Sequence, residues 1–184
     1  MNQMDDDIQL VGRFRSGDES AFDALLERYQ RRVYATAYRM TNDLEEAKDV
    51  TQKVFLNVYQ GLPGFRQDAS FKTWLYQICV NVCLNQVRQR RSVEVELDES
   101  LCSGGQCPLS SLIEHEERAR LRTALERVPG RQRMAVILRV YEGLDVRETA
   151  SAMGCSEGAV KAHYHQAVQK LKKIMAEDGH GRVA

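Results

Sequence analysis

The stretch Asp145–Met175, DVRETASAMGCSEGAVKAHYHQAVQKLKKIM, carries the most specific local signal in the chain. Asp145 with Glu148 three residues later forms a capping pair, which predicts the start of a short helix. Gly154 is suited to end that helix in a tight turn with positive φ, and Ser156 can cap the helix that follows. Two helices joined by a glycine turn predict a helix-turn-helix, a motif that places its second helix in the major groove of DNA.

The second helix of this unit is expected to bury one apolar stripe and to expose small and cationic side chains on its other side. Small side chains near its start let a helix enter the major groove, where Lys161, His165 and Gln166 can reach phosphates or base edges. An ordinary helical hairpin with a solvated basic face is the alternative interpretation. A metal site is not expected here, because His163 and His165 point about 200° apart on a helix.

Upstream of residue 92 the chain has a helical pattern throughout. Apolar residues recur with a period of about 3.6 residues across 22–40, which predicts one helix. Asp43 and Glu46 form a second capping pair, which predicts that another helix begins there. Glycine and proline residues within 61–64 are expected to end that helix, and Ser70 is a candidate N-cap for a third.

The stretch Ser70–Arg91, SFKTWLYQICVNVCLNQVRQRR, combines aromatic residues, amides and arginines. On a helical wheel it has two apolar stripes, and the narrow polar strip between them contains Gln77, Asn81 and Arg88. A helix that is apolar on two sides packs between neighbouring elements. Its aromatic residues are therefore more often core residues than stacking partners of bases. Amides can pair with the edges of unpaired bases, and amides, aromatics and arginines together suit a single strand.

Charge is distributed unevenly along the 184 residues, although the formal net charge is zero. Residues 1–91 carry 13 basic and 12 acidic side chains, 92–116 carry none and six, and 117–184 carry 13 and eight. The acidic middle segment has no helical period and is rich in serine and glycine, which is typical of a linker. The basic excess after residue 117 is a hint of nucleic-acid contact by that half. With 43% apolar residues the chain can form a packed core, in one domain or in two small ones.

No apolar run approaches the ~20 residues that span a membrane, and the acidic N-terminus lacks the basic residues of a signal peptide. Five cysteines without a disulfide-scaffold spacing indicate reduced thiols in a cytoplasmic protein. Cys79 and Cys83 could share a metal ion, but buried thiols that fill a core are much commoner. Cys102 and Cys107 could form a redox-sensitive loop, although a reduced pair is the default in the cytoplasm. No catalytic triad, paired-carboxylate signature or phosphate-binding glycine loop is apparent, so neither an enzyme nor a cofactor is expected.

Three segments, in order along the chain, resemble sigma factors of the extracytoplasmic-function group of the sigma-70 family. They are GDESAFDALLERYQRRVY, EEAKDVTQKVFLNVYQGLPGFRQDASFKTWLYQICVNVCLNQVRQRR and ALERVPGRQRMAVILRVYEGLDVRETASAMGCSEGAVKAHYHQAVQKL. The resemblance implies an all-α fold with two small helical domains. Sigma region 2 would occupy residues 1–91, a flexible acidic linker 92–116, and sigma region 4, with the helix-turn-helix, 117–184.

The family resemblance also implies partners: core RNA polymerase, through its β′ and β subunits, promoter DNA, and an anti-sigma factor. The residues that would bind polymerase are Asp49, Gln52, Lys53 and Asn57. The residues that would contact the opened minus-ten element are Phe65, Arg66, Asp68, Ser70, Lys72, Trp74, Asn81, Arg88, Arg90 and Arg91. The residues that would read the duplex minus-thirty-five element are Ser156, Glu157, Gly158, Ala159, Lys161, Ala162, His165 and Gln166.

The chain departs from the family pattern at several of these positions. Lys53 stands where the family usually has glutamate, which reverses one charge on the surface that would bind polymerase. Ala159 stands where a threonine is usual, and AHYHQAV replaces an arginine-rich stretch, which bears on the promoter sequence that is read. A stand-alone helix-turn-helix regulator is the alternative function, but it leaves the N-terminal half of the chain without a role.

Overall fold

Eight α-helices and two short helical turns account for most of residues 3–96 and 112–180, the part of the chain that the computed structural model describes. The N-terminal helices are α1 (Gln3–Arg15), α2 (Ser20–Thr41), α3 (Leu44–Gly61) and α4 (Phe71–Glu96), with the turn η1 at Leu62–Gly64. The C-terminal helices are α5 (Leu112–Glu126), α6 (Gly130–Val136), α7 (Val146–Met153) and α8 (Glu157–His180), with the π-helical turn η2 at Ile137–Tyr141. The described residues contain no strand, and the prediction of an all-α fold with two helical domains is confirmed.

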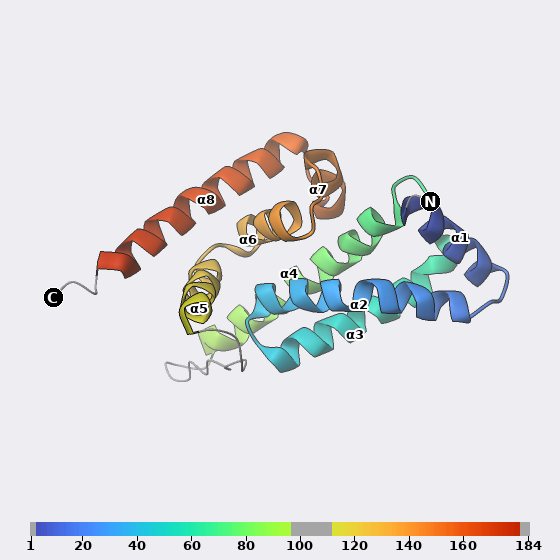
Figure 1. The fold of residues 1–184 in the computed structure, drawn as a ribbon, viewed down its shortest axis with the longest axis horizontal. Coiled ribbons are helices and arrows are strands. Elements are labelled where there is room, and N and C mark those ends of the chain that lie inside the picture. The colour runs from blue at the N-terminus through green and yellow to red at the C-terminus, as the bar shows by residue number, and fades with distance from the viewer. Residues whose placement is uncertain (1–2, 97–111, 181–184) are drawn as a thin grey trace.

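The N-terminal domain is a bundle in which α2, α3 and α4 pack together and α1 lies against them (Figure 1). Apolar residues at helical spacing supply its core, and Tyr29, Tyr76 and Leu25 are among the largest fully buried side chains. The hydroxyl of Tyr29 on α2 donates to the carboxylate of Asp7 on α1, which also pairs with Arg28. This buried contact fixes α1 on the bundle.

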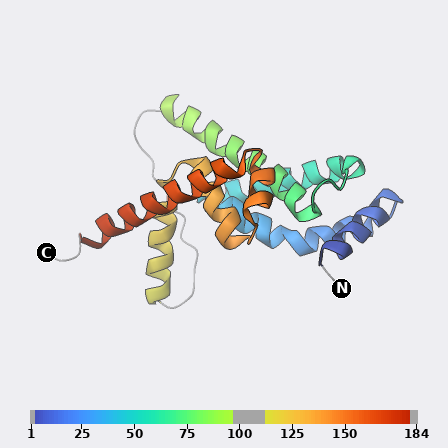
Figure 2. The same ribbon diagram turned by 90° about the horizontal axis from the view of Figure 1, so that it is seen from above.

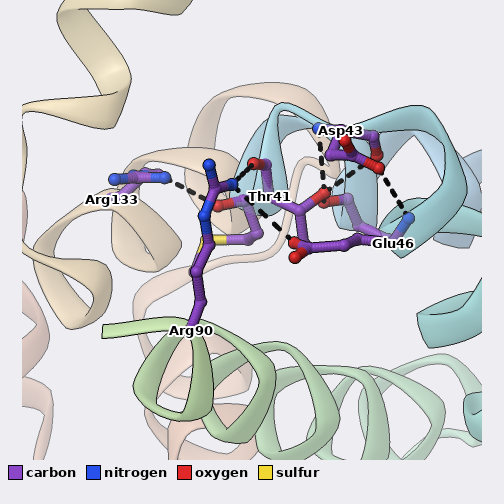
Figure 3. A network of polar contacts seen from close by, with 7 residues as sticks. Thr41, Asp43, Glu46, Arg90 and Arg133 are labelled. Atoms are coloured by element: carbon purple, nitrogen blue, oxygen red, sulfur yellow. Dashed lines mark hydrogen bonds and ion pairs between the residues drawn. The ribbon is translucent and has the colours of Figure 1, made fainter. Parts of the chain in front are cut away.

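The turn between α2 and α3 contains the N-cap of α3, as the capping pattern in the sequence predicts. The side chain of Asp43 accepts a hydrogen bond from the backbone N–H of Glu46 at 2.8 Å. Arginines from two other helices also bind this turn (Figure 3): Arg90 of α4 donates to the carbonyl of Thr41 at 3.1 Å, and Arg133 of α6 donates to the carbonyl of Met40 at 2.6 Å. The turn therefore joins α4 and the C-terminal domain to the start of α3.

The C-terminal domain packs directly on the N-terminal bundle. The helix α7 packs against α4, and α6 contacts both α2 and α4. Figures 1 and 2 show α6, α7 and the start of α8 lying along one side of the bundle. One apolar core is continuous across this boundary, since Ile137 and Leu138 belong to the same buried cluster as Tyr76 and Cys79. This contact between the domains was not predicted from the sequence.

The predicted linker, 92–116, lies largely outside the described residues. At its two ends the structure is helical, because α4 continues to Glu96 and α5 begins at Leu112. The continuation of α4 has a local reason: no glycine or proline stands between Ser92 and Glu96 to end the helix.

Candidate nucleic-acid and polymerase interfaces

A hollow of about 330 Å³ lies between the loop at 65–70 and the start of α4. We call it the loop pocket. Its lining residues are Gly64, Phe65, Arg66, Asp68, Ala69, Trp74, Gln77 and Ser151. Ser151 belongs to α7, so the C-terminal domain borders the loop pocket.

Aromatic rings form the wall of the loop pocket. Phe65 is only 4% exposed, and its ring lies 4.9 Å from the ring of Trp74 and 6.2 Å from that of Phe71, centroid to centroid. Trp74 itself lies close against the end of α3, where a Cβ on Gly61 would come within 3.1 Å of the indole. The aromatic residues of this stretch are thus largely core residues, and only part of Trp74 faces the hollow.

Both ends of the loop are held by side chains. Arg15 of α1 donates to the carbonyl of Phe65 and, at 3.4 Å, to that of Leu62. At the other end, the hydroxyl of Ser70 accepts from the backbone N–H of Thr73 at 3.1 Å, as expected of an N-cap. Sequence reasoning missed Arg15, because no spacing rule connects it with a loop 47 to 50 residues away.

A strip of polar side chains runs along α4 from the loop pocket. Gln77, Asn81, Asn85 and Arg88 are all exposed and follow one another at helical spacing. Because successive members are three or four residues apart, they lie on one face of the helix. The amides therefore continue the lining of the loop pocket along one exposed face.

Lys72 and Arg90 are not part of this strip. Lys72 turns to the C-terminal domain, where its ammonium donates to the carbonyl of Glu142 at 2.8 Å, and burial lowers its pKa. Arg90 binds Thr41 and lies 3.9 Å from the carboxylate of Glu46 (Figure 3). The side chain of Arg91 lies outside the described residues. The residues predicted for the minus-ten element therefore divide into a loop-pocket group and a group that holds other helices.

The four residues predicted to bind polymerase share the exposed face of α3. They are Asp49, Gln52, Lys53 and Asn57. The same face carries Leu56, which is 57% exposed, and Tyr59, which is 42% exposed. A second hollow, of about 340 Å³, lies beside Gln52 between α2 and α3. Sequence reasoning missed Leu56, although an apolar residue among polar ones on a helix face was the available signal.

The helix-turn-helix forms as the sequence predicts. Asp145 and Glu148 make a complete capping box, with bonds of 2.7 and 2.8 Å. Gly154 has a φ of 58°, and the hydroxyl of Ser156 accepts from the backbone N–H of Ala159 at 3.2 Å. These local contacts set the angle at which α8 leaves the turn.

The start of α8 is well exposed. The exposed side chains among the predicted duplex-reading residues are Ser156, Glu157, Lys161, Ala162, His165 and Gln166. Gly158 is exposed as well, while Ala159 is half-buried. The amide oxygen of Gln166 accepts from Gln132 of α6 at 2.7 Å, so Gln132 is a neighbour that the sequence did not indicate.

The cysteines that the structure describes are free thiols. Cys79 and Cys83 are buried with their sulfur atoms 3.9 Å apart, and the contact with Cys83 together with burial raises the pKa of Cys79. Such thiols are poor nucleophiles. Cys102 and Cys107 lie outside the described residues. Within 3–96 and 112–180, no three potential ligands gather as a metal site, and no helix has the length and hydropathy of a membrane span.

Comparison with known protein families finds two matches in the order expected. The family model for Sigma-70 region 2 matches residues 25–93, and that for Sigma-70, region 4 matches residues 118–171. The RNA polymerase sigma-H factor of Pseudomonas aeruginosa is 34% identical, covering 95% of this chain and 96% of that protein. The ECF RNA polymerase sigma-E factor of Escherichia coli is 33% identical, covering 93% and 95%.

Solved structures share the fold. CnrH, solved in complex with the cytosolic domain of CnrY, aligns with a TM-score of 0.73 at 24% identity, covering 94% of this chain and 99% of that one. The sigma factor RpoE of Bartonella quintana, solved in complex with the anti-sigma factor NepR, aligns with a TM-score of 0.69 at 22% identity, covering 84% and 96%.

Proposed function

Because the chain belongs to the sigma-70 family of RNA polymerase sigma factors, in the extracytoplasmic-function group, and so directs polymerase to promoters, we propose that its two domains recognise two forms of promoter DNA. The N-terminal domain, region 2, holds the opened strand of the minus-ten element. The C-terminal domain, region 4, reads the minus-thirty-five element as duplex. The observation that carries this proposal is the loop pocket with its adjoining strip of exposed amides.

The loop pocket suits one unstacked base. A base that leaves the stack needs a hollow with apolar walls and hydrogen-bonding groups at its edge. Trp74 supplies an apolar wall, and Arg66, Asp68 and Gln77 supply polar groups. The amides of Asn81 and Asn85 then face bases whose pairing edges are free, which is the case only after the strands separate.

The start of α8 suits duplex DNA. It protrudes from the turn at Gly154, and its small exposed residues allow close approach to a groove. Lys161 and His165 are the exposed side chains closest to its N-terminus that can reach phosphates or base edges. A stand-alone regulator is not favoured as the function, because the family match includes both domains.

For polymerase, the exposed face of α3 is the proposed docking surface for the β′ subunit. Its centre, Leu56, offers apolar area within a polar surround formed by Gln52, Lys53 and Asn57, the usual composition of a protein interface. Region 4 is proposed to contact the β subunit. An anti-sigma factor is a further proposed partner, since a structural relative was solved with one.

The experiment that tests the DNA assignment is permanganate footprinting of the promoter bubble beside filter binding of the closed complex, both with holoenzyme. Asn81→Ala is expected to reduce strand opening about 5- to 150-fold, the effect of about 1–3 kcal/mol of lost base contacts, while duplex binding stays unchanged. Gln86→Ala is the control, because Gln86 is a half-buried amide on α4 that lies five residues from Asn81 and therefore on a different face of the helix. Normal opening by Asn81→Ala would refute the proposed role of the strip.

A further inference from the structure

Glu142 is a buried carboxylate whose hydrogen-bond partners all belong to the other domain. It follows η2 in region 4 and is only 3% exposed. One carboxylate oxygen accepts from the hydroxyl of Thr36 at 2.8 Å, and the other accepts from the hydroxyl of Tyr76. Arg32 lies 3.4 Å from the second oxygen. These three partners are on α2 and α4 of region 2.

The carboxylate of Glu142 can be buried without a large energetic cost only because region 2 supplies its hydrogen-bond and charge partners. A buried ionised carboxylate is strongly unfavourable unless hydrogen-bonded and paired with opposite charge. Tyr76 remains a donor at ordinary pH, since burial and the neighbouring carboxylate of Glu142 raise its pKa. Lys72 adds a bond from region 2 to the backbone carbonyl of Glu142 at 2.8 Å. The contact between the domains therefore includes a polar site that is complete only when both are present.

Apolar and cationic contacts surround this polar site. Ile137, Leu138 and Leu144 are fully buried in the core that the domains share. Nearby, the guanidinium of Arg39 lies 4.1 Å from the ring centre of Tyr141. Arg133, itself buried, binds the carbonyl of Met40 (Figure 3). The contact between the domains therefore combines apolar packing with buried polar groups that are hydrogen-bonded, as buried polar groups usually are.

The same contact places the two DNA-reading surfaces close together. Ser151 of α7 lines the loop pocket, and only three residues separate the end of α7 from the start of α8. The minus-ten and minus-thirty-five elements are about 25 base pairs apart, or about 85 Å at about 3.4 Å per base pair. One chain cannot contact both elements while α7 borders the loop pocket.

We propose that the docked arrangement is a closed state of the free sigma factor, in which region 4 binds region 2 of the same chain through Ile137, Leu138, Glu142 and Leu144. In this state Lys72 is bound to region 4 and α7 covers one side of the loop pocket. The domains separate before both promoter elements are read. The closed state itself is independent of the proposed DNA-reading roles, and its consequence for promoters rests on them.

The test is hydrogen–deuterium exchange with mass spectrometry, together with small-angle X-ray scattering, on the free full-length protein. Glu142→Gln keeps the shape of the side chain and removes its charge and one acceptor oxygen. Exchange in 137–144 is expected to accelerate at least about tenfold, as for the loss of a hydrogen bond to a charged group, and the radius of gyration to increase. Glu177→Gln, at an exposed position on α8, is the matched control and leaves both measurements unchanged.

Thr36→Val tests the contact from the region 2 side. Thr36 lies 106 residues before Glu142 in sequence, yet its loss is expected to accelerate exchange in the same segment, 137–144. The double variant with Glu142→Gln should exceed the stronger single variant only slightly, because both changes remove one shared contact.

Three results would overturn the proposal. Scattering that shows separated domains in the unaltered protein would mean that there is no closed state. Unchanged exchange in both single variants would exclude the contact at Glu142. Equal acceleration throughout α8 would assign Glu142 to the stability of region 4 alone. None of these measurements includes promoter DNA, so failure of the closed state is distinguishable from failure of the proposed reading roles.

Discussion

The loop pocket and the start of α8 differ in shape and in charge. The loop pocket is a hollow with an aromatic wall in a domain whose acidic and basic residues nearly balance. The start of α8 is the exposed face of a helix in the part of the chain with the basic excess. A single base needs to be enclosed and hydrogen-bonded, whereas a duplex needs a protruding element and charge to attract its phosphates. The two surfaces therefore suit two physical states of the same nucleic acid.

Removal of the wall of the loop pocket is expected to have the greatest effect on stability. Phe65→Ala deletes a buried ring and is expected to destabilise region 2 by about 3–5 kcal/mol. Urea denaturation measures this loss. In the Phe65→Ala variant, duplex binding by region 4 should be unchanged at urea concentrations too low to unfold region 2. Leu56→Ala is the control, since Leu56 is mostly exposed and should cost little stability. A stability change below about 1 kcal/mol for Phe65→Ala would contradict the packing described here.

A change on α3 separates polymerase binding from both DNA surfaces. Asp49→Arg combined with Gln52→Ala is expected to weaken binding to core polymerase about 100-fold, because a reversed charge and a lost polar contact fall within one interface. Co-purification with core polymerase measures the effect, and circular dichroism verifies that the fold is intact. Undiminished co-purification would place the polymerase surface elsewhere.

A change in the turn before α8 tests the proposed duplex-reading surface alone. Gly154→Ala forces a residue with a Cβ to adopt a φ of 58°, and is expected to cost about 1–2 kcal/mol. The melting temperature of region 4 should fall. Strand opening should decrease only as far as the amount of folded protein decreases. Gly158→Ala is the control, because Gly158 lies in a helix and has no contact closer than 3.9 Å to an added Cβ. An equal or larger loss for the control variant would show that the turn geometry is not what matters.

Loss of a single positive charge at the start of α8 tests how charge contributes to duplex binding. Lys161→Ala should leave stability within about 0.5 kcal/mol and reduce the salt dependence of holoenzyme binding to duplex by about one phosphate contact. Filter binding across a range of salt concentrations measures the slope. Lys173→Ala, at the far end of α8, serves as the comparison. If strand opening fails in Lys161→Ala while duplex affinity is unchanged, the assignment of duplex reading to α8 is wrong.

Local features of this fold could be predicted from sequence because their physics is local. The capping residues Asp43 and Asp145, the turn glycine Gly154 and the cap Ser156 act on backbone groups within a few residues of themselves. Helical spacing also predicted the exposed amide strip on α4. Each of these depends on a regular geometry that any helix shares.

Contacts between distant segments could not be predicted in this way. Glu142 precedes a glycine and resembles an ordinary helix end, and nothing in its neighbours indicates that Thr36 and Tyr76 bind it. Arg15 similarly resembles a solvated residue in the last turn of a helix. Long-range polar contacts depend on how whole helices pack, and a pattern of residue types along one helix does not contain that information.

The hydrogen bonds made by Arg15 limit where a stable fragment of region 2 can begin. The family match begins at residue 25, and a fragment that began there would keep every residue proposed to contact the minus-ten element. It would lack α1, so the carbonyls of Leu62 and Phe65 would lose Arg15 as their donor, and the hydroxyl of Tyr29 would lose Asp7. The shape of the pocket thus depends in part on α1, a helix that contributes no residue to its lining, and we expect the minimal folded unit of region 2 to begin before residue 25.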